Sequence, residues 1–340
     1  MKKVLLIAGE GDKGKWLLHQ TPGGRGVWRG YEFVVNDLNA EADFVVVRGK
    51  CLKRKHTFRV APENVLLTTS EPYPVLAYPK AYCRQFATVC SCQEQLRHPG
   101  VVYTPPVLGW FAGVSGFTRR QPKAEMLYED YRRPLPPKEK LLSVITSNKA
   151  FTRGHRERIR FVERLKAHYG DRLDLYGQGF RDFEDKMEVL APYRYHIVIE
   201  NSRSRYYFTE KLTDCYLAGV FPFYYGCTNV SDYFPSEAFR TIDVRDPDGA
   251  IRTIDEAIAN DVAARAAEAL TACRDLVLDK YNLFEIIAEQ LDRKDAGARK
   301  QDVVLRPCRT MSNWHNAKLY LWDRNVSKLA YRAERLFGSK

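Results

Sequence analysis

A run of thirteen residues, ENSRSRYYFTEKL from Glu200 to Leu212, concentrates side chains that could bind an anion or a sugar. It contains two acids, an amide, three aliphatic hydroxyls and three cations, although apolar runs precede and follow it. The preceding run, YHIVI, is typical of a buried strand. Because open α/β sheets bind ligands at the carboxyl ends of their parallel strands, these thirteen residues are the first candidate for a binding site.

The position of Lys211 points to an anionic ligand. Thr209 is suited to cap a helix that continues through TDCYLAG, so Lys211 would lie in the first turn of that helix. A cation is unfavourable there, at the positive end of the helix dipole, unless an anion binds beside it. A pyrophosphate would explain the lysine, the free backbone N–H groups and the hydroxyl-rich loop together. The alternative is a capped surface helix with a solvated loop.

Strand and helix patterns alternate along the rest of the chain. The predicted strands are residues 4–8, 43–47, 64–69, 141–147, 173–177, 195–200 and 239–244, and the predicted helices are 152–169, 209–218 and 253–280. This alternation is typical of parallel sheets covered by helices. A polar, proline-rich stretch at 119–140 is the best candidate for a linker. We therefore predict two α/β domains, residues 1–138 and 139–305.

The net charge of +12 indicates an anionic partner, and residues 306–340 carry half of it, with eight Lys or Arg and two acids. Apolar residues recur there at spacings of three and four, which predicts a basic amphipathic C-terminal helix. The apolar stripe is Leu319, Trp322, Val326, Leu329, Ala333 and Leu336. Such a helix could pack on the first domain or lie on an anionic membrane, and the sequence leaves both open. Cations do not alternate with aromatics as in a nucleic-acid groove, so no nucleic-acid partner is expected.

The first apolar run, Val4 to Ala8, has five residues. A signal peptide needs an apolar stretch of roughly 7–15 residues and a membrane span about 20. We therefore expect a cytoplasmic protein, whose eight cysteines would be reduced thiols.

Two other motifs resemble nucleotide-binding sequences. Gly9 to Gly14 matches GxGxxG after a strand, but the glycines and proline of residues 21–26 would break the helix that a dinucleotide site needs. A P-loop reading fails because Trp16 stands where Ser or Thr should bind magnesium. Residues 246–248, Asp-Pro-Asp, resemble the DxD of metal-dependent sugar transferases but are more simply a turn. A NAD-type oxidoreductase using the Gly9–Gly14 loop is therefore kept only as a remote alternative.

The order of residues around Lys211 closely resembles the donor-binding signature of the α1,3/4-fucosyltransferases, glycosyltransferase family 10. In that signature, E-N-S is followed by four variable residues and Y-x-T-E-K, then by a helix and a strand with proline and glycine. Here these elements are residues 200–202, 207–211, Pro222 and Gly226, without a gap. The resemblance covers about residues 143–291. It is faint over the first 140 residues, apart from Ser70-Glu71-Pro72 and the region 83–106.

The resemblance implies a GT-B fold, in which two Rossmann-like domains face a cleft and the second domain binds a nucleotide sugar. Lys211 and Arg158 would neutralise the pyrophosphate in place of a metal ion, so that no metal and no cofactor is required. Arg156 is an alternative to Arg158, because both lie in one arginine-rich helix. Glu210 and Asn201 would hold the sugar and ribose side of the donor.

Two further roles follow from the same resemblance. Tyr207 would line the nucleotide pocket, and Glu71 would be the general base that deprotonates the acceptor hydroxyl. The family often has Glu-Ser-Pro where this chain has Ser-Glu-Pro. The alignment of Glu71 with the family's glutamate therefore differs by one residue. The bland alternative for Glu71 is a turn residue before Pro72.

The function implied is an inverting transfer of fucose from GDP-fucose, the co-substrate, to a hydroxyl of a glycan acceptor. A GT-B transferase that uses another nucleotide sugar is the nearer alternative, because a pyrophosphate site does not identify the sugar. A cytoplasmic enzyme with a basic tail suggests a lipopolysaccharide or another surface glycan as the acceptor, and a peripheral contact with the inner face of the membrane.

Overall fold

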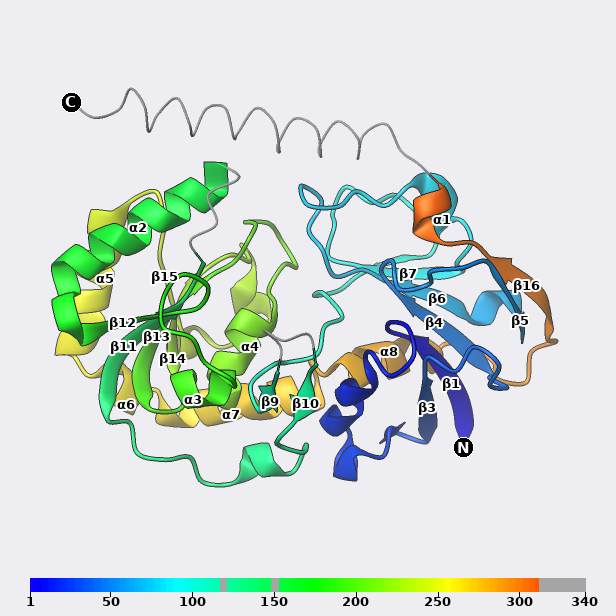
Figure 1. The fold of residues 1–340 in the computed structure, drawn as a ribbon, viewed down its shortest axis with the longest axis horizontal. Coiled ribbons are helices and arrows are strands. Elements are labelled where there is room, and N and C mark those ends of the chain that lie inside the picture. Colours follow the sequence, from blue (N-terminus) through cyan, green and yellow to red (C-terminus); the bar gives the residue numbers. More distant parts are fainter. Residues whose placement is uncertain (117–120, 148–152, 312–340) are drawn as a thin grey trace.

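The protein has two α/β domains that lie side by side (Figure 1). A computed structural model describes residues 1–116, 121–147 and 153–311. Within these residues no helix combines the length and the apolar character that crossing a bilayer would require. The predicted C-terminal helix and its apolar stripe lie beyond Met311, outside the described residues.

The first domain is built on a seven-stranded sheet with the order β2-β3-β1-β4-β6-β7-β8. Its strands are β1 (Lys2–Ile7), β2 (Val27–Trp28), β3 (Tyr31–Val35), β4 (Phe44–Arg48), β6 (Val65–Thr68), β7 (Thr88–Ser91) and β8 (Val101–Tyr103). All neighbours pair in parallel except β2 and β3. The central strands are apolar on both faces because each face is covered, as expected for a parallel sheet. The short helix α1 (Lys80–Cys83) connects β6 to β7.

The second domain has a fully parallel sheet of five strands with the order β12-β11-β13-β14-β15. The strands are β11 (Lys140–Ile145), β12 (Leu173–Tyr176), β13 (Tyr193–Ile199), β14 (Phe221–Tyr225) and β15 (Arg240–Thr241). Its helices are α2 (Arg153–Tyr169), α3 (Lys186–Leu190), α4 (Glu210–Leu217), α5 (Pro247–Ala259), α6 (Val262–Arg265) and α7 (Ala267–Asp279). This alternation confirms the predicted α/β class.

The helix predicted over residues 253–280 is interrupted, and that prediction was wrong in its continuity. Helix α5 ends at Ala259, and Asp261 has a left-handed backbone (φ 47°) before the chain continues through α6 and α7. Asn and Asp tolerate this conformation better than most residues, so Asn260-Asp261 forms the break. The Asp261 carboxylate is also ion-paired with Arg194, which fixes the break against β13.

After α7 the chain returns to the first domain, so the expected second domain of residues 139–305 extends too far. Helix α8 (Leu283–Leu291) packs its apolar residues into the core formed by β1, β3 and β4. Strand β16 (Gln301–Leu305) then pairs antiparallel with β5 (His56–Val60) of the first domain. The second domain therefore ends near residue 282, and both ends of the described chain belong to the first domain (Figure 1).

The segment between the domains is anchored rather than free. It contains the short hairpin of β9 (Val114–Ser115) and β10 (Lys123–Ala124). Trp110 and Tyr131 are buried in the core of the second domain. Two carboxylates of that domain accept backbone N–H groups from the segment: Asp214 from Phe111 at 2.9 Å, and Asp185 from Gly113 at 2.8 Å. Within the stretch predicted as a linker, the described residues contact both domains: Tyr131 is buried in the second, and Glu129 accepts the N–H of Gly23 in the first at 2.8 Å.

Asn282 lies buried at the point where the chain passes back from the second domain to the first. Its side-chain oxygen accepts the N–H of Phe284 (2.8 Å) and caps α8, while its amide nitrogen donates to the carbonyls of Gln20 (2.8 Å) and Leu278 (3.1 Å). We expect Asn282→Ala to lower the free energy of unfolding by about 2–3 kcal/mol, because a cap is lost and a buried carbonyl loses its donor.

Urea unfolding followed by tryptophan fluorescence measures this change. Asn260→Ala is the matched control, since Asn260 is exposed and, among the described residues, its side chain donates to the carbonyl of Glu256 alone. An equal loss of unfolding free energy in both variants would contradict a stabilising role for the Asn282 side chain at the connection between the domains.

Candidate active site

A pocket of about 420 Å³ opens at the carboxyl ends of β11 and β13, next to the start of α4. This is the edge at which parallel sheets bind ligands. The pocket is lined by Phe111, Val114, Ile145, Thr146, Ser147, Arg158, Phe183, Glu184, Lys186, Leu190, His196, Ile197, Val198, Ile199, Asn201, Glu210, Lys211 and Asp214. It therefore combines an apolar floor with a dense group of charged side chains, as small-molecule sites commonly do.

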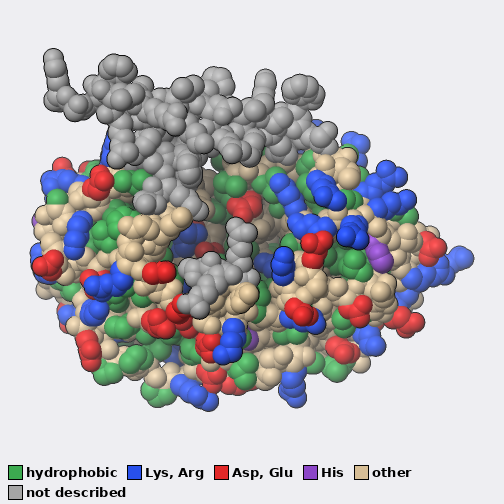
Figure 2. Space-filling model, in the orientation of Figure 1, with side chains coloured by type: hydrophobic (Ala, Val, Ile, Leu, Met, Phe, Trp, Pro, Cys, Tyr) green, Lys and Arg blue, Asp and Glu red, His purple; other side chains and the backbone are tan. Residues whose placement is uncertain are grey.

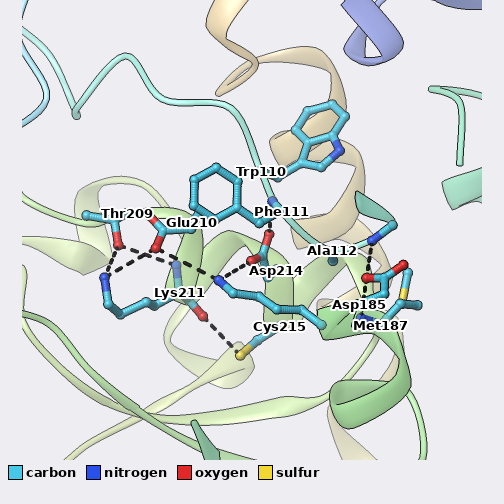
Figure 3. Close-up of polar contacts among 12 residues, drawn as sticks. Trp110, Phe111, Ala112, Asp185, Met187, Thr209, Glu210, Lys211, Asp214 and Cys215 are labelled. Carbon is cyan, nitrogen blue, oxygen red and sulfur yellow. Dashed lines mark hydrogen bonds and ion pairs between the residues drawn. The ribbon is translucent and has the colours of Figure 1, made fainter. Parts of the chain in front are cut away.

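The charged side chains form one continuous series. The ammonium nitrogen of Lys211 lies 3.4 Å from Oε2 of Glu200 and 3.4 Å from Oε1 of Glu210. The ammonium nitrogen of Lys186 lies 3.8 Å from the same Glu210 oxygen and 2.7 Å from Oδ2 of Asp214. Figure 3 shows the links at Lys211, Glu210 and Asp214. Two ammonium groups thus alternate with three carboxylates, of which Glu210 and Asp214 line the pocket while Glu200 is fully buried and does not.

The sequence folds this way locally because Thr209 and Glu200 together organise the start of α4. The Thr209 hydroxyl accepts the backbone N–H of Lys211 at 3.3 Å, which is the predicted N-cap. The fully buried Glu200 carboxylate in turn accepts the N–H of Thr209 at 2.7 Å and its hydroxyl at 2.8 Å. Lys211 therefore lies in the first turn of α4, as its sequence position predicted.

Burial and pairing shift the pKa values of this series in opposite directions. Burial opposes ionisation of Glu210, but Lys211 and Lys186 outweigh it and lower the pKa of Glu210 to about 2. Burial also raises the pKa of Glu200 and that of Asp214, which the same lysines only partly offset. For Lys211, burial is outweighed by Glu210 and Glu200, so its pKa is raised and it stays charged.

Arg158 and Asn201, two of the predicted donor-binding residues, also line the pocket. The Nη2 atom of Arg158 donates to Ser147 at the end of β11, at 3.3 Å to the carbonyl and 3.1 Å to the hydroxyl. Its Nε atom is buried and has no hydrogen-bond partner among the described residues, which leaves a donor available to a ligand. The side chain of Arg156, the alternative cation, lies outside what the structure describes.

Tyr207 is buried but is not among the side chains that line the pocket. Its neighbour Tyr206 has a left-handed backbone (φ 62°) and reaches the first domain. There its ring stacks on that of Tyr103, with centroids 5.6 Å apart and an interplanar angle of 10°. The loop that was predicted to bind the donor therefore also contacts the first domain.

Glu71 follows β6 at the carboxyl edge of the first sheet and is not among the residues that line the pocket. Its pKa is raised by burial, lowered by the charge of Lys211 and raised by that of Glu210, so its carboxylate lies within electrostatic range of both. Gln93 fixes the backbone of this turn by donating to the carbonyls of Glu71 (2.7 Å) and Leu76 (2.7 Å). Residue 71 is exposed to solvent overall, but surrounding protein atoms still desolvate its carboxylate in part, which is the burial that raises its pKa.

Lys186 and Asp214 were not predicted as site residues. Lys186 begins the short helix α3, which is capped by Asp185, and only its place just before an apolar strand could have indicated it. Asp214 lies one turn after Glu210 on α4, so helical spacing places both carboxylates on one face. Asp214 also holds the inter-domain segment through Phe111, a link that no local sequence pattern reveals.

In the two other motifs that resemble nucleotide-binding sequences, neighbouring protein groups form the hydrogen bonds. Asn36 fills the Gly9 loop: its side-chain oxygen accepts the N–H groups of Ala8 (2.8 Å) and Gly9 (3.0 Å), and its amide donates to the carbonyl of Gly11 (2.9 Å). A 3-10 helix over residues 15–20 follows instead of an α-helix. Asp246 caps α5 by accepting the N–H of Gly249 at 2.9 Å, so the Asp-Pro-Asp motif is a helix start.

Comparison with known proteins agrees with this geometry. Residues 135–252, which include the charged series, match the family model of glycosyltransferase family 10 (fucosyltransferase), C-terminal part. An α1,3-fucosyltransferase of known structure is similar over 78% of this chain and 80% of its own, with 15% identity and a TM-score of 0.50. An α-glucosyltransferase in complex with UDP-glucose and DNA containing an abasic site is similar over 86% and 98%, with 9% identity and a TM-score of 0.51. No curated protein matches the chain in sequence.

The two structural likenesses confirm the predicted GT-B fold, and the family match lies on the segment that carries the pocket. The chain is therefore a glycosyltransferase of the GT-B fold, and residues 135–252 of its second domain match the C-terminal part of the fucosyltransferases of glycosyltransferase family 10.

Proposed function

We propose that this glycosyltransferase transfers fucose from GDP-fucose to a hydroxyl group of a glycan acceptor, with inversion at the anomeric carbon. One observation carries the proposal. Two partly buried ammonium groups, those of Lys211 and Lys186, line a pocket beside the N-terminal end of α4, inside the segment that matches the fucosyltransferase family model. Cations and a helix N-terminus together form a suitable site for a diphosphate.

In the proposed complex the diphosphate lies against Lys211, with Arg158 as the second cation and Lys186 supporting Glu210. The leaving GDP gains negative charge as its bond to fucose breaks, and fixed ammonium and guanidinium groups stabilise that charge without a metal ion. Asn201 and Glu210 bind hydroxyl groups of the donor.

Glu71 is the proposed general base, because its carboxylate, on the other domain, lies within electrostatic range of Lys211 and Glu210. Its carboxylate takes the proton of the acceptor hydroxyl as the acceptor oxygen forms its bond to the anomeric carbon. The bond between that carbon and the phosphate oxygen breaks, and its electron pair leaves with GDP. A single displacement from the opposite side inverts the anomeric configuration.

The acceptor and the location are proposed from the sequence. A lipopolysaccharide or another surface glycan fits a cytoplasmic enzyme with a basic tail, and the tail would contact the inner face of the membrane. Residues 312–340 lie outside the described residues, so this part rests on their charge and apolar spacing.

The first prediction concerns donor identity and metal dependence. GDP is expected to raise the melting temperature more than UDP, ADP or NAD, because a ligand at about 100 times its dissociation constant adds about 2.7 kcal/mol of stability. Fucose transfer should continue in excess EDTA. A larger shift with UDP would favour another nucleotide sugar, a shift with NAD alone would favour the oxidoreductase, and activity abolished by EDTA and restored by manganese would contradict a metal-free site.

Replacing Lys211 tests the donor site. Lys211→Ala is expected to weaken GDP-fucose binding by about 10- to 100-fold in titration calorimetry, because a charged contact to phosphate is lost. Lys138→Met is a matched control. Lys138 is also a partly buried lysine of the second domain, but it donates to the carbonyls of Ala191 and Ala218 and lies outside this pocket. Both variants should be less stable, and only Lys211→Ala should lose donor affinity.

Replacing Glu71 tests the chemical step. Glu71→Gln is expected to lower kcat by about 100- to 10,000-fold while donor affinity stays within about twofold, as for the loss of a general base. Because the pKa of Glu71 is raised and the base must be deprotonated, kcat/KM should fall as the pH drops through a value above the usual glutamate range. Near-normal turnover of Glu71→Gln would place the base elsewhere in the first domain.

A further inference from the structure

A strongly basic surface covers one side of the first domain. Residues 50–59, 80–84 and 306–309 contain nine Lys or Arg and no acid, and all nine of these side chains are exposed. We call these nine cations the basic face. Figure 2 shows Lys and Arg gathered over this part of the molecule, in the region of α1, β5 and β16.

Described contacts hold the three segments together as one surface. Gln85, just after α1, accepts the backbone N–H of Arg306 at 2.8 Å and donates to its carbonyl at 3.1 Å. The Tyr82 hydroxyl donates to the carbonyl of Gly49 at 2.7 Å. Strand β5, which ends the first segment, pairs along its length with β16, which leads into the third. The positions of the cations are therefore fixed by the fold.

Little of this charge is neutralised within the described residues. Their one ion pair that involves the basic face joins Arg59 to Asp302 at 3.3 Å, with both side chains well exposed. Such a pair contributes little and is easily exchanged for another partner. Val304 of β16 is 44% exposed beside these cations, which adds an apolar contact point. So much exposed positive charge on one side of the domain favours binding of an extended anionic partner.

A lipid surface fits the basic face better than a single-stranded nucleic acid does. Proteins that bind single strands place exposed aromatic rings between their cations, whereas Phe58 and Tyr82, the aromatic residues of these segments apart from His56, are buried. The described chain ends at Met311, directly after the basic face, and residues 312–340 continue with further cations and an apolar repeat. Both features are typical of peripheral membrane contact.

We propose that the basic face binds the surface of an anionic phospholipid bilayer. Lys50, one of its members, lies within electrostatic range of Glu71 and of Cys308, so the surface extends from the third segment to the mouth of the cleft. An acceptor held in that bilayer reaches the cleft without leaving the membrane. The binding itself does not depend on which donor or acceptor the enzyme uses.

The test compares two charge-reversed variants of the full chain. One carries Arg54→Glu, Lys55→Glu and Lys80→Glu in the basic face, and the other carries Arg172→Glu, Arg252→Glu and Arg265→Glu, which are exposed on the second domain. Flotation with vesicles of phosphatidylcholine, with or without phosphatidylglycerol, measures binding. We expect the first variant to bind anionic vesicles at least about tenfold more weakly than the unmodified chain, and the second to stay within about twofold.

Further arms of the experiment make the proposal falsifiable. Raising NaCl from about 0.1 M to about 1 M should release the unmodified chain, because the screening length falls from about 10 Å to about 3 Å. If the first variant unfolds, the milder set Arg54→Ser, Lys55→Ser and Lys80→Ser replaces it, with an expected loss of about fivefold. The proposal is overturned if the basic-face variant binds anionic vesicles as tightly as the unmodified chain does. It is also overturned if the unmodified chain binds neutral vesicles as tightly as anionic ones, or if the basic-face variant loses affinity for duplex DNA but not for anionic vesicles.

Discussion

The Lys211 ammonium, held between the carboxylates of the buried Glu200 and the partly buried Glu210, is the interaction on which the proposed donor site depends. Burying a charge is costly unless partners surround it, and removing one member of such a group leaves the others uncompensated. Glu200 is fully buried and also holds Thr209, so one carboxylate sets both the helix start and the lysine. The pocket is therefore arranged before any ligand enters, which limits the reorganisation needed when negative charge develops.

The same series of charged side chains also contacts the inter-domain segment that precedes β11. Lys186 connects Glu210 to Asp214, and the other Asp214 oxygen accepts the N–H of Phe111 in the inter-domain segment. Helix α4 thus lines the proposed donor pocket at its first turn and contacts the inter-domain segment one turn later. On the opposite side, Tyr206 stacks on Tyr103 of the first domain. The second domain's signature segment therefore positions the cleft as well as lining it.

The α/β class, the cap at Thr209 and the place of Lys211 in the first helical turn could be predicted from the sequence, because each depends on local pattern or on helix-terminus chemistry. Lys186 could not, because its importance comes from a contact between α3 and α4 that local spacing does not encode. The break at Asp261 was missed because alanine-rich flanks favour a continuous helix. The return of α8 and β16 to the first domain was missed because an amphipathic pattern shows that a face is buried and does not show against what.

The return of α8 and β16 to the first domain restricts how the two domains can move relative to each other. The second domain is joined to the first by two covalent connections, the segment before β11 and the one at Asn282, rather than by a single tether. A body attached at two points can rotate about the line through them, but it cannot twist or translate freely without stretching one attachment. Opening of the cleft is therefore expected to follow one angular coordinate, so that Glu71 and Lys211 separate and approach along the same arc in every cycle.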